Sequence, residues 1–265
     1  MVTPDPKQEI LFDVDGQIAT ITFNRPEAMN AMTWNMYDRL VTYCDELDQN
    51  DDIRVAIFKG AGDRAFVSGT DIGQFRAFAT PRDAIDYERR TGEVTDRLER
   101  VSKPTIAMIH GVCVGGGAGI ALACDFRYAD PNLRFGIPIA RTIGNCLSLK
   151  SYSRIVDYVG PAKAKELIML AKLLNADEAL RLGVMTEIVP AEDLEARVRE
   201  VAERLTTLAP LTLAATKEAI RRIQVERSLD NEAGEDLILS CYMSEDFQGA
   251  VQAFLEKRKY AWTGR

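Results

Sequence analysis

Three consecutive glycines, Gly115 to Gly117, stand directly before an alanine-rich stretch typical of a helix, in the segment HGVCVGGGAGIALACD at residues 110–125. Glycine lets the backbone approach a ligand closely, and the free N–H groups and positive dipole end of a helix N-terminus attract negative charge. The segment therefore predicts a site for an anion or for charge that develops during a reaction. Close packing of a strand against a helix also selects glycine, and this alternative stays open here.

Two common phosphate-binding motifs do not fit the segment. A Walker phosphate loop needs a lysine next to its last glycine, whereas the first lysine after Gly117 is Lys150. A dinucleotide-binding loop needs the spacing G-x-G-x-x-G, and counting from Gly115 places Ile120 at the third glycine. A helix N-terminus that stabilises a localised oxyanion is the chemistry that remains.

Composition restricts the class of partner. The chain has 265 residues, 46% of them hydrophobic, and a net charge of -7 without a basic block, which argues against nucleic acid. Its five cysteines show no C-x-x-C spacing, so we expect no metal site, no disulfide framework and a reducing, cytoplasmic location. The N-terminal residues MVTPDPKQEI lack the pattern of a signal peptide.

One segment is long and apolar enough to be weighed as a membrane span. Residues 105–124 carry no acidic, lysine or arginine side chain over about the length that crosses a bilayer. The glycines and His110 inside this segment favour a buried strand, turn and helix instead, so we expect no membrane partner.

Short β-rich runs alternate with segments of helical periodicity, which predicts an α/β core with parallel strands. The Asp15-Gly16 turn signal predicts that the chain opens with a hairpin, and Thr33 is a candidate N-cap. We divide the chain into an α/β core at residues 1–209 and a helical region at residues 210–265. The expected strands are 9–14, 18–23, 55–58, 105–109, 126–128 and a short one before Pro190; the expected helices are 33–47, 71–78, 88–101, one ending at Gly183, 194–205, 212–225 and a helical region at 234–259.

A second segment repeats the strand–turn–helix pattern. The sequence AFVSGTDIGQF, residues 65–75, follows a β-rich run, contains a glycine and leads into a helix with Asp71 as a natural N-cap. Two such turns supply the two backbone donors that an oxyanion hole requires.

Five segments, in order and spread over nearly the whole chain, resemble motifs of the enoyl-CoA hydratase/isomerase superfamily, which has the crotonase fold. They are ITFNRPEAMNAM, FVSGTDI, IHGVCVGGGAGIALACD, EALRLGVMTEIVP and FLEKRKYAWTG. The resemblance implies a spiral of strand–strand–helix units with a helical C-terminal region that builds a homotrimer or hexamer. It also implies an acyl-CoA thioester as substrate, with no cofactor beyond its coenzyme A.

The same resemblance assigns the oxyanion hole. The backbone N–H groups of Thr70 and Gly116 would hold the oxygen of a thioester enolate, so the glycines would serve charge that develops in the transition state. Thioester α-protons become removable when that oxygen is stabilised.

The resemblance also implies where coenzyme A lies. The residues that would line its path are Ala28, Ser68, Asp71 and Ile72. Asp71 has two alternative roles: the N-cap of the following helix, or a base beside the acyl group. Tail positions Phe254 and Lys257 match residues that contact the adenine end in relatives, often from a neighbouring subunit. A solvated surface is the alternative role for Lys257.

The chain departs from the hydratase pattern at both catalytic glutamates. The first follows the glycine triplet by two positions, where this chain has Gly119, and the second falls at Ile139 in GIPIAR. Hydratases use these two carboxylates to activate and orient water. An ordinary hydratase mechanism is therefore not expected, and Ile139 becomes a candidate substrate contact.

Replacement groups are sought in the turn ARTIGNCLS, residues 140–148, which resembles chlorobenzoyl-CoA dehalogenases, where the nucleophilic aspartate stands at the position of Cys146. Cys146 could be a thiolate nucleophile, a proton donor or a small buried hydrophobe. Asn145 could orient water or a carboxylate, or serve the turn. Arg141 could bind an acidic acyl group or form a surface salt bridge. His110 and Asp125 are expected to be structural.

These observations lead to an expected function. We expect a lyase or isomerase that acts on a CoA thioester and stabilises its enolate. Decarboxylation of a malonyl-type CoA needs the least acid/base equipment, because loss of carbon dioxide generates the enolate. Hydrolysis or another lyase step through Cys146 or a water bound to Asn145 is one alternative, and a non-catalytic acyl-CoA-binding protein is another.

Overall fold

The predicted N-terminal hairpin is present. In the computed structural model, which describes residues 9–229 and 231–265, β1 (Ile10–Asp15) and β2 (Ile18–Phe23) pair antiparallel. Gly16 in the turn has a φ of 59°, a conformation that glycine adopts without strain. The side chains of β2 alternate between the two faces of the sheet that it joins.

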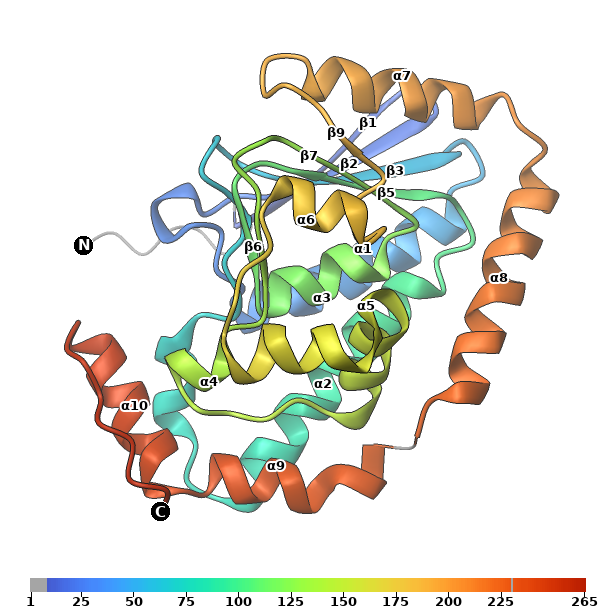
Figure 1. Ribbon diagram of the computed structural model, residues 1–265. Helices are drawn as coiled ribbons and strands as arrows, with labels where there is room; N and C mark the ends of the chain where they lie inside the picture. The colour runs from blue at the N-terminus through green and yellow to red at the C-terminus, as the bar shows by residue number, and fades with distance from the viewer. Residues whose placement is uncertain (1–8, 230) are drawn as a thin grey trace.

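Two sheets carry the fold (Figure 1). The main sheet has the order β1-β2-β3-β5-β7-β9 and is parallel from β2 onward, and a second parallel sheet has the order β4-β6-β8. The chain crosses repeatedly from one sheet to the other and then enters a helix, so strand–strand–helix units repeat as expected. The remaining strands are β3 (Val55–Gly60), β4 (Ala65–Val67), β5 (Thr105–Ile109), β6 (Val112–Val114), β7 (Phe126–Ala129), β8 (Arg134–Gly136) and β9 (Glu187–Ile188).

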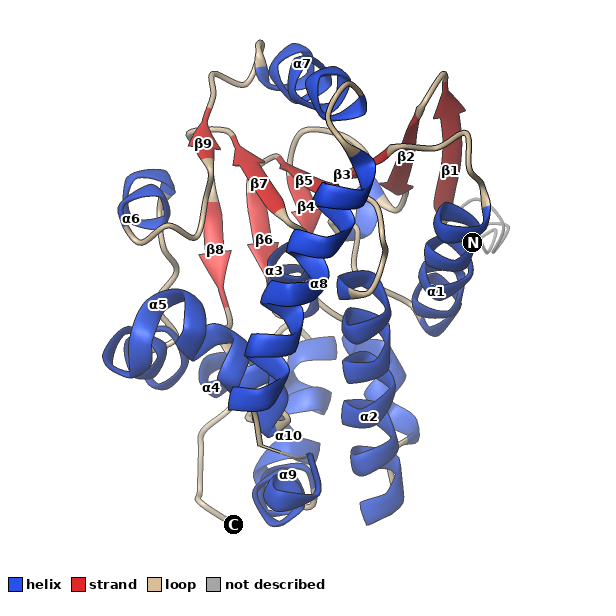
Figure 2. Ribbon diagram, turned by 90° about the vertical axis from the view of Figure 1, so that its right-hand side faces the viewer, coloured by secondary structure: helices blue, strands red, loops and turns tan. Residues whose placement is uncertain are grey.

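Helices surround these sheets (Figure 2). Thr33 caps the first α-helix by accepting a hydrogen bond from the Met36 N–H, as predicted. The α-helices are α1 (Trp34–Gln49), α2 (Pro81–Glu99), α3 (Gly116–Ala123), α4 (Ile139–Thr142), α5 (Leu149–Met169), α6 (Ala176–Arg181), α7 (Leu194–Thr206), α8 (Pro210–Arg227), α9 (Glu235–Tyr242) and α10 (Glu245–Leu255); the 3-10 helices are η2 (Pro26–Ala28), η3 (Ile72–Ala77) and η4 (Asn231–Gly234).

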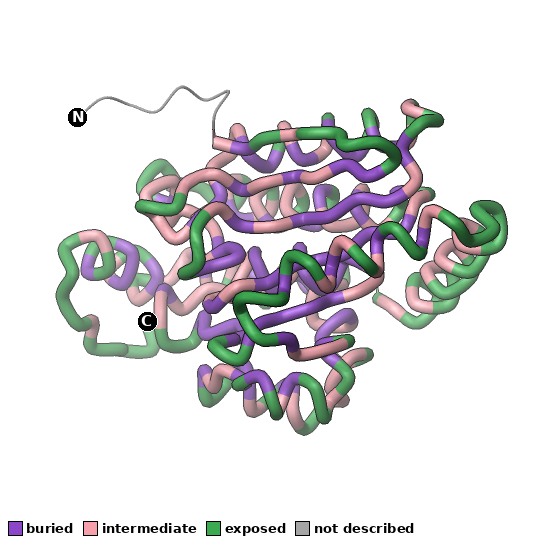
Figure 3. Tube along the Cα trace, turned by 90° about the horizontal axis from the view of Figure 1, so that it is seen from above, coloured by how far each residue is buried: buried purple, intermediate pink, exposed green. Residues whose placement is uncertain are grey.

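The main sheet buries both of its faces. Along β3, Val55 and Ile57 pack on the side of α7, whereas Ala56 and Phe58 belong to the large core that contains α1 and α3. Because successive side chains of a strand point to opposite faces, a continuous apolar run such as this one marks a strand that is covered on both sides. Figure 3 shows buried residues along the central strands and exposed ones on the outer helices.

A third apolar cluster joins the C-terminal helices to the core. Phe75 of η3 stacks edge-on against Tyr87 of α2, with ring centroids 4.9 Å apart, and the cluster includes Tyr242 of α9 and Phe247 of α10. α9 therefore lies against α2, and α10 lies against η3. The preceding helix, α8, begins at Pro210, next to the expected domain boundary.

Several predicted elements differ in type or length from those observed. Residues 72–77 form a 3-10 helix, not an α-helix, because Asp71 caps Gly73 and the turn is tight. The helix expected from Glu88 begins at Pro81, where Thr80 and Asp83 form a capping box before a polar first turn. The region 234–259 is two helices, because α9 ends at Tyr242 with Met243 as its C-cap, and Ser244 then caps α10.

Within residues 9–229 and 231–265, every helix is too short or too polar to cross a membrane. The segment 105–124 forms β5, β6 and α3, as the strand, turn and helix interpretation predicts.

Candidate active site

The two predicted turns lie side by side because their strands pair. β4 and β6 are parallel neighbours, with Ala65 opposite Val112 and Val67 opposite Cys113, so both strands deliver the chain to the same edge of their sheet. Beyond the strands, Gly69 and Gly115 have φ values of 107° and 56°, which turn the backbone sharply before Thr70 and Gly116.

The glycines of the second turn have different roles. A Cβ added at Gly117 would lie 2.1 Å from the carbonyl oxygen of Val67, so α3 can pack on the end of β4 only with glycine there. A Cβ added at Gly116 would lie 3.7 Å from Thr70 N and 2.6 Å from Tyr37 Oη. One alternative from the sequence, close packing, is therefore present at Gly117. At Gly116, the Tyr37 hydroxyl stands where a side chain would begin, and the backbone of Thr70 lies nearby.

Two backbone N–H groups remain free between these turns. Met32 donates to the Gly69 carbonyl, Asp71 donates to the Met32 carbonyl, and Gly115 donates to the Gly136 carbonyl. In the part of the chain that the structure describes, neither Thr70 N–H nor Gly116 N–H donates a hydrogen bond. Two free donors near a helix N-terminus are the equipment of an oxyanion hole.

A row of hydroxyl groups borders the free donors. Thr70 Oγ1 lies 2.8 Å from Tyr37 Oη and 2.9 Å from Tyr87 Oη. Burial raises the pKa of Tyr37 to about 12 and also raises the pKa of Tyr87, so both phenols stay neutral and hold the Thr70 side chain by hydrogen bonds.

A cavity of about 70 Å³ opens beside Gly116. Its wall combines the glycine turn before α3, the hydroxyl row, one face of α2, and side chains from α5 and the turn before it. The lining residues are Tyr37, Tyr87, Glu88, Thr91, Thr95, Gly115, Gly116, Gly119, Ile120, Leu122, Ile137, Leu147, Ser151, Arg154 and Ile155.

Glu88 is the carboxyl group of this cavity, and the sequence interpretation missed it. Its side chain is buried; Oε1 accepts from the Tyr242 hydroxyl at 2.7 Å and Oε2 accepts from the Ser148 N–H at 2.9 Å. Burial raises its pKa to about 7. A detectable signal exists: Glu88 falls in the buried stripe of α2, four residues from Ala84 and from Gly92.

Asn145 belongs to the same network. Its Nδ2 donates to the Tyr242 hydroxyl at 3.1 Å, and Tyr242 in turn donates to Glu88. Among the described residues, the buried Asn145 Oδ1 has no hydrogen-bond partner. A turned amide would place Oδ1 at the Tyr242 hydroxyl, where it could accept a hydrogen bond only when Tyr242 does not donate to Glu88.

Cys146 is buried, with its Sγ 3.5 Å from Tyr152 Oη. Contact with Cys241, followed by burial, raises the pKa of the Cys146 thiol, which disfavours the thiolate. Arg141 is exposed on α4 and forms no ion pair within the described ranges. Ile139 is buried at the start of the same helix, and Gly119 lines the cavity, so neither position offers a carboxylate.

The predicted coenzyme A residues fall into two groups. Ser68 Oγ lies 3.5 Å from the carbonyl oxygen of Ala28, so these two lie together. Asp71 caps η3 and forms an ion pair with Arg25 at 3.1 Å, and Ile72 follows it. Phe254 and Lys257 are exposed at the end of α10, the helix that packs on η3 of the same chain.

The two residues expected to be structural make internal contacts. His110 Nδ1 lies 3.1 Å from Asp130 Oδ2, and Asp130 also accepts from the Gly111 N–H. Asp125 accepts from the Thr105 N–H at 2.7 Å and from Lys217 of α8 at 2.8 Å. Residues 9–229 and 231–265 contain no cluster of three or more potential metal ligands.

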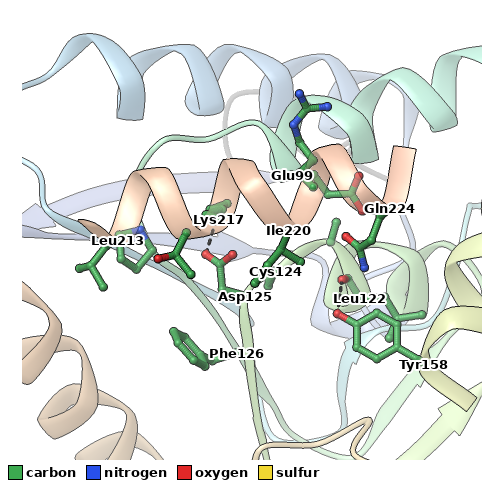
Figure 4. Close-up of a pocket in the computed structure, with 14 residues that line it drawn as sticks. Glu99, Leu122, Cys124, Asp125, Phe126, Tyr158, Leu213, Lys217, Ile220 and Gln224 are labelled. Atoms are coloured by element: carbon green, nitrogen blue, oxygen red, sulfur yellow. Dashed lines mark hydrogen bonds and ion pairs between the residues drawn. The ribbon is translucent and has the colours of Figure 1, made fainter. Parts of the chain in front are cut away.

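A larger cavity of about 360 Å³ lies elsewhere, between α8 and the core. Figure 4 shows Leu213, Lys217 and Ile220 of α8 facing Asp125 and Tyr158 across it. Lys217 and Asp125 are joined by the ion pair, and the Tyr158 hydroxyl donates to the Leu122 carbonyl at 3.1 Å. None of the free N–H groups of the oxyanion turns lines this second cavity.

Comparisons with known proteins agree with the sequence resemblance. A model of the enoyl-CoA hydratase/isomerase family matches residues 13–265. The short-chain-enoyl-CoA hydratase of Clostridium acetobutylicum is 33% identical over 256 residues, which cover 94% of this chain and 95% of that protein. The (E)-benzylidenesuccinyl-CoA hydratase of Thauera aromatica is 33% identical over 262 residues, which cover 96% and 99%.

Solved structures agree as well. A methylmalonyl-CoA decarboxylase in complex with 2-nitronate-propionyl-CoA superposes with a TM-score of 0.89 at 27% identity, covering 97% of this chain and 99% of that one. An enoyl-CoA hydratase/isomerase from Xanthobacter autotrophicus superposes with a TM-score of 0.84 at 27% identity, covering 94% and 93%. The chain therefore has the crotonase fold and belongs to the enoyl-CoA hydratase/isomerase family.

Proposed function

We propose that this chain is an enzyme that binds an acyl-CoA thioester and stabilises its enolate with the N–H groups of Thr70 and Gly116. The observation that carries the proposal is the pair of free donors on two adjacent turns, one of which, at Gly116, lines a cavity. Donors fixed before the reaction cost no reorganisation when charge develops, and one such donor is worth ~2.7–4 kcal/mol in acyl-transfer enzymes.

Decarboxylation of a malonyl-type CoA is the reaction that we propose. With Gly119 and Ile139 at the hydratase carboxylate positions, the usual pair that activates water is missing. Decarboxylation does not need that pair, because departure of carbon dioxide leaves its electron pair on the thioester as an enolate. The likeness to a methylmalonyl-CoA decarboxylase, at 27% identity, supports this choice among the reactions of the family.

Coenzyme A would extend from Thr70 and Gly116, where its thioester lies, past the residues around Ser68 to the end of α10. We assign its pantetheine path to Ala28, Ser68, Asp71 and Ile72. The adenine end would reach Phe254 and Lys257, which are exposed at the end of α10. We also propose a homotrimer, alone or paired as a hexamer, built by residues 210–265; α8 exposes Leu211, Ile220 and Ile223 in the single chain.

Mass spectrometry in deuterated buffer tests the reaction. Malonyl-CoA and methylmalonyl-CoA are expected to lose the mass of carbon dioxide and gain at least one deuteron at the α-carbon, because the product thioester can exchange further. Propionyl-CoA is likewise expected to exchange its α-protons. Addition of water to crotonyl-CoA without decarboxylation would assign a hydratase instead. Tight binding of every thioester with no mass change would establish a non-catalytic acyl-CoA-binding protein.

A further inference from the structure

We propose that Glu88 is a catalytic residue of this site and that its carboxyl group exchanges a proton with the α-carbon of the bound thioester. The inference rests on the proposed enolate-stabilising function and adds the acid/base group that the function lacks. It places the carboxyl group on α2, not at either position where the hydratase pattern has a glutamate.

The first support is the position of the side chain. Glu88 lines the same cavity as Gly116, whose free N–H would hold the enolate oxygen. Gly119, which has no side chain, lines that cavity too, and a Cβ there would have Thr95 Cγ2 as its nearest neighbour at 3.8 Å. The space left at Gly119 is therefore bordered by the face of α2 that carries Glu88 and Thr95.

The second support is the way the carboxyl group is held. Oε2 accepts from the backbone N–H of Ser148, which fixes one oxygen, and Oε1 meets the Tyr242 hydroxyl. A hydroxyl group can donate or accept, and the Asn145 amide behind it can turn to present either its nitrogen or its oxygen. When Glu88 is ionised, Tyr242 donates to it and Asn145 Nδ2 donates to Tyr242. When Glu88 is protonated, it donates to Tyr242, which donates to Asn145 Oδ1.

This network therefore satisfies both protonation states of one buried carboxyl group. A purely structural glutamate needs only one of them. Tyr242 and Asn145 are positioning residues in this scheme, because they act through Glu88 and not on the substrate. The buried Asn145 Oδ1, unpartnered in the described residues, is the acceptor that the protonated state requires.

Within residues 9–229 and 231–265, the Glu88 carboxyl group forms no ion pair, although Arg154 and Arg89 line the two openings beside it. Tyr37 of α1, Tyr87 of α2 and Tyr242 of α9 surround it as phenols, and burial raises their pKa values. On the α5 side, Arg154 is engaged by Glu99 at 2.6 Å. Glu88 and Ser148 also line a second opening on the opposite side, together with the charged residues Arg89, Glu232 and Glu235. The Cys146 thiol lies in the turn before α5.

The proton step balances with these groups. In decarboxylation, the bond between the α-carbon and the carboxylate breaks, carbon dioxide leaves, and the electron pair forms the enolate held by Thr70 and Gly116. The pair then forms a C–H bond with the Glu88 proton, and the resulting carboxylate regains a proton from water. In exchange of a saturated thioester, the carboxylate removes an α-proton and returns a deuteron from the solvent.

Exchange of propionyl-CoA α-protons in deuterated buffer tests the role. The E88Q variant keeps the size of the side chain and can accept from Ser148 while donating to Tyr242, with Asn145 turned. We expect its exchange rate to fall ~10²–10⁴-fold, the usual contribution of general acid/base catalysis. Its Kd for propionyl-CoA should stay within about threefold. The matched control is E93Q, an exposed position on the same helix, which should exchange like the wild type.

The pH profile and a second variant separate a catalytic role from a structural one. Wild-type exchange should rise with pH through the pKa of Glu88, and E88D, which retains a carboxyl group, should restore part of the rate lost in E88Q. If E88Q exchanges at the wild-type rate, the role of Glu88 is overturned and the oxyanion hole stands. If the wild type binds propionyl-CoA and does not exchange it, the enolate function itself falls, and the role of Glu88 with it.

Discussion

The hydroxyl oxygens of Tyr37 and Thr70 lie 2.8 Å apart, and this contact joins the glycine turn at Thr70 to α1. Tyr37 is buried, and its hydroxyl lies beside both Thr70 and Gly116. Two sets of contacts hold the backbone of Thr70 in place. Its side chain contacts Tyr37, and the neighbouring backbone is hydrogen-bonded to Met32, which donates to the Gly69 carbonyl and accepts from the Asp71 N–H. A donor fixed on two sides is preorganised for charge that appears only in the transition state.

Adding one methyl group at Gly116 should abolish the chemistry. The Cβ of G116A would lie 2.6 Å from Tyr37 Oη and 3.5 Å from Thr70 Oγ1, in the space that an enolate oxygen needs. We expect propionyl-CoA exchange to fall at least ~10²-fold, with ~1–3 kcal/mol lost from the free energy of unfolding through overpacking. Exchange by mass spectrometry and urea unfolding measure the two effects.

G119A is the matched comparison for G116A. Its added methyl group has ordinary contact with Thr95 at 3.8 Å, and alanine favours the helix by up to ~1 kcal/mol. Exchange should fall less than tenfold and stability should not decrease. Equal losses in the two variants would contradict a special role for the Gly116 position.

Stability should depend on pH through Glu88. Burial raises the pKa of Glu88 from 4.5 to about 7, so between these values the folded protein binds the proton more tightly than the unfolded chain. The contribution of Glu88 is fully present below pH about 4.5 and is lost as pH rises through 7, which removes about 3 kcal/mol from the free energy of unfolding.

The E88Q variant isolates this contribution because glutamine does not titrate. Urea unfolding of both proteins can be measured below pH 4.5 and above pH 7. The free energy of unfolding of E88Q should increase relative to that of the wild type as the pH rises. A constant difference between the two proteins would mean that Glu88 has an ordinary pKa in the folded state.

The Cys146 thiol is expected to be dispensable for the reaction. It is buried, and contact with Cys241 and burial raise its pKa, so little thiolate is present near neutral pH. C146A should keep the exchange and decarboxylation rates within about threefold and cost ~1 kcal/mol of stability, as a small buried side chain does. A loss of 10²-fold or more, or a covalent adduct in the wild type seen by intact-protein mass spectrometry, would instead make Cys146 a nucleophile.

Segment length explains only part of what was predictable from the sequence. The short strands expected at 126–128 and before Pro190 are present as β7 and β9, whereas the long helix α5, which is interrupted at Gly160, was not among the expected helices. The helix after Thr33 and the strands 18–23 and 105–109 have enough residues to display their period. β6 and β8 have three residues each and are defined by pairing with neighbours far along the chain, which no local pattern records. The first turns of α2 are polar, so periodicity alone placed its start seven residues late.

The site divides in the same way. Both glycine turns that we propose as the oxyanion hole carry a local signature, a strand followed by glycine and a helix start. The pairing of β4 and β6 brings these turns together. Glu88 has no such motif, and its environment comes from Ser148 and Tyr242, which are 60 and 154 residues away in the chain. The helical spacing from Ala84 and Gly92 indicates that Glu88 faces inward, but only the folded structure shows that it lines the cavity and contacts Ser148 and Tyr242.

Lys217 should anchor α8 to the core. Its ammonium group donates to Asp125 at 2.8 Å, to Thr105 Oγ1 at 3.3 Å and to the Lys103 carbonyl at 3.2 Å, in a partly buried position beside the large cavity (Figure 4). K217M keeps most of the apolar stem and removes all three hydrogen bonds. We expect the free energy of unfolding to fall by ~1–3 kcal/mol, because Asp125 loses a charged partner.

K59M provides the control, since it removes a lysine whose partner, Glu195, is exposed. The side chain of Glu195 is 76% accessible, so water screens the pair and its loss should cost less than ~1 kcal/mol. Urea unfolding at neutral pH compares the two variants directly. Equal costs for K59M and K217M would mean that the contact between α8 and the core depends on its apolar residues, Leu213 and Ile220 among them, and not on the ion pair with Asp125.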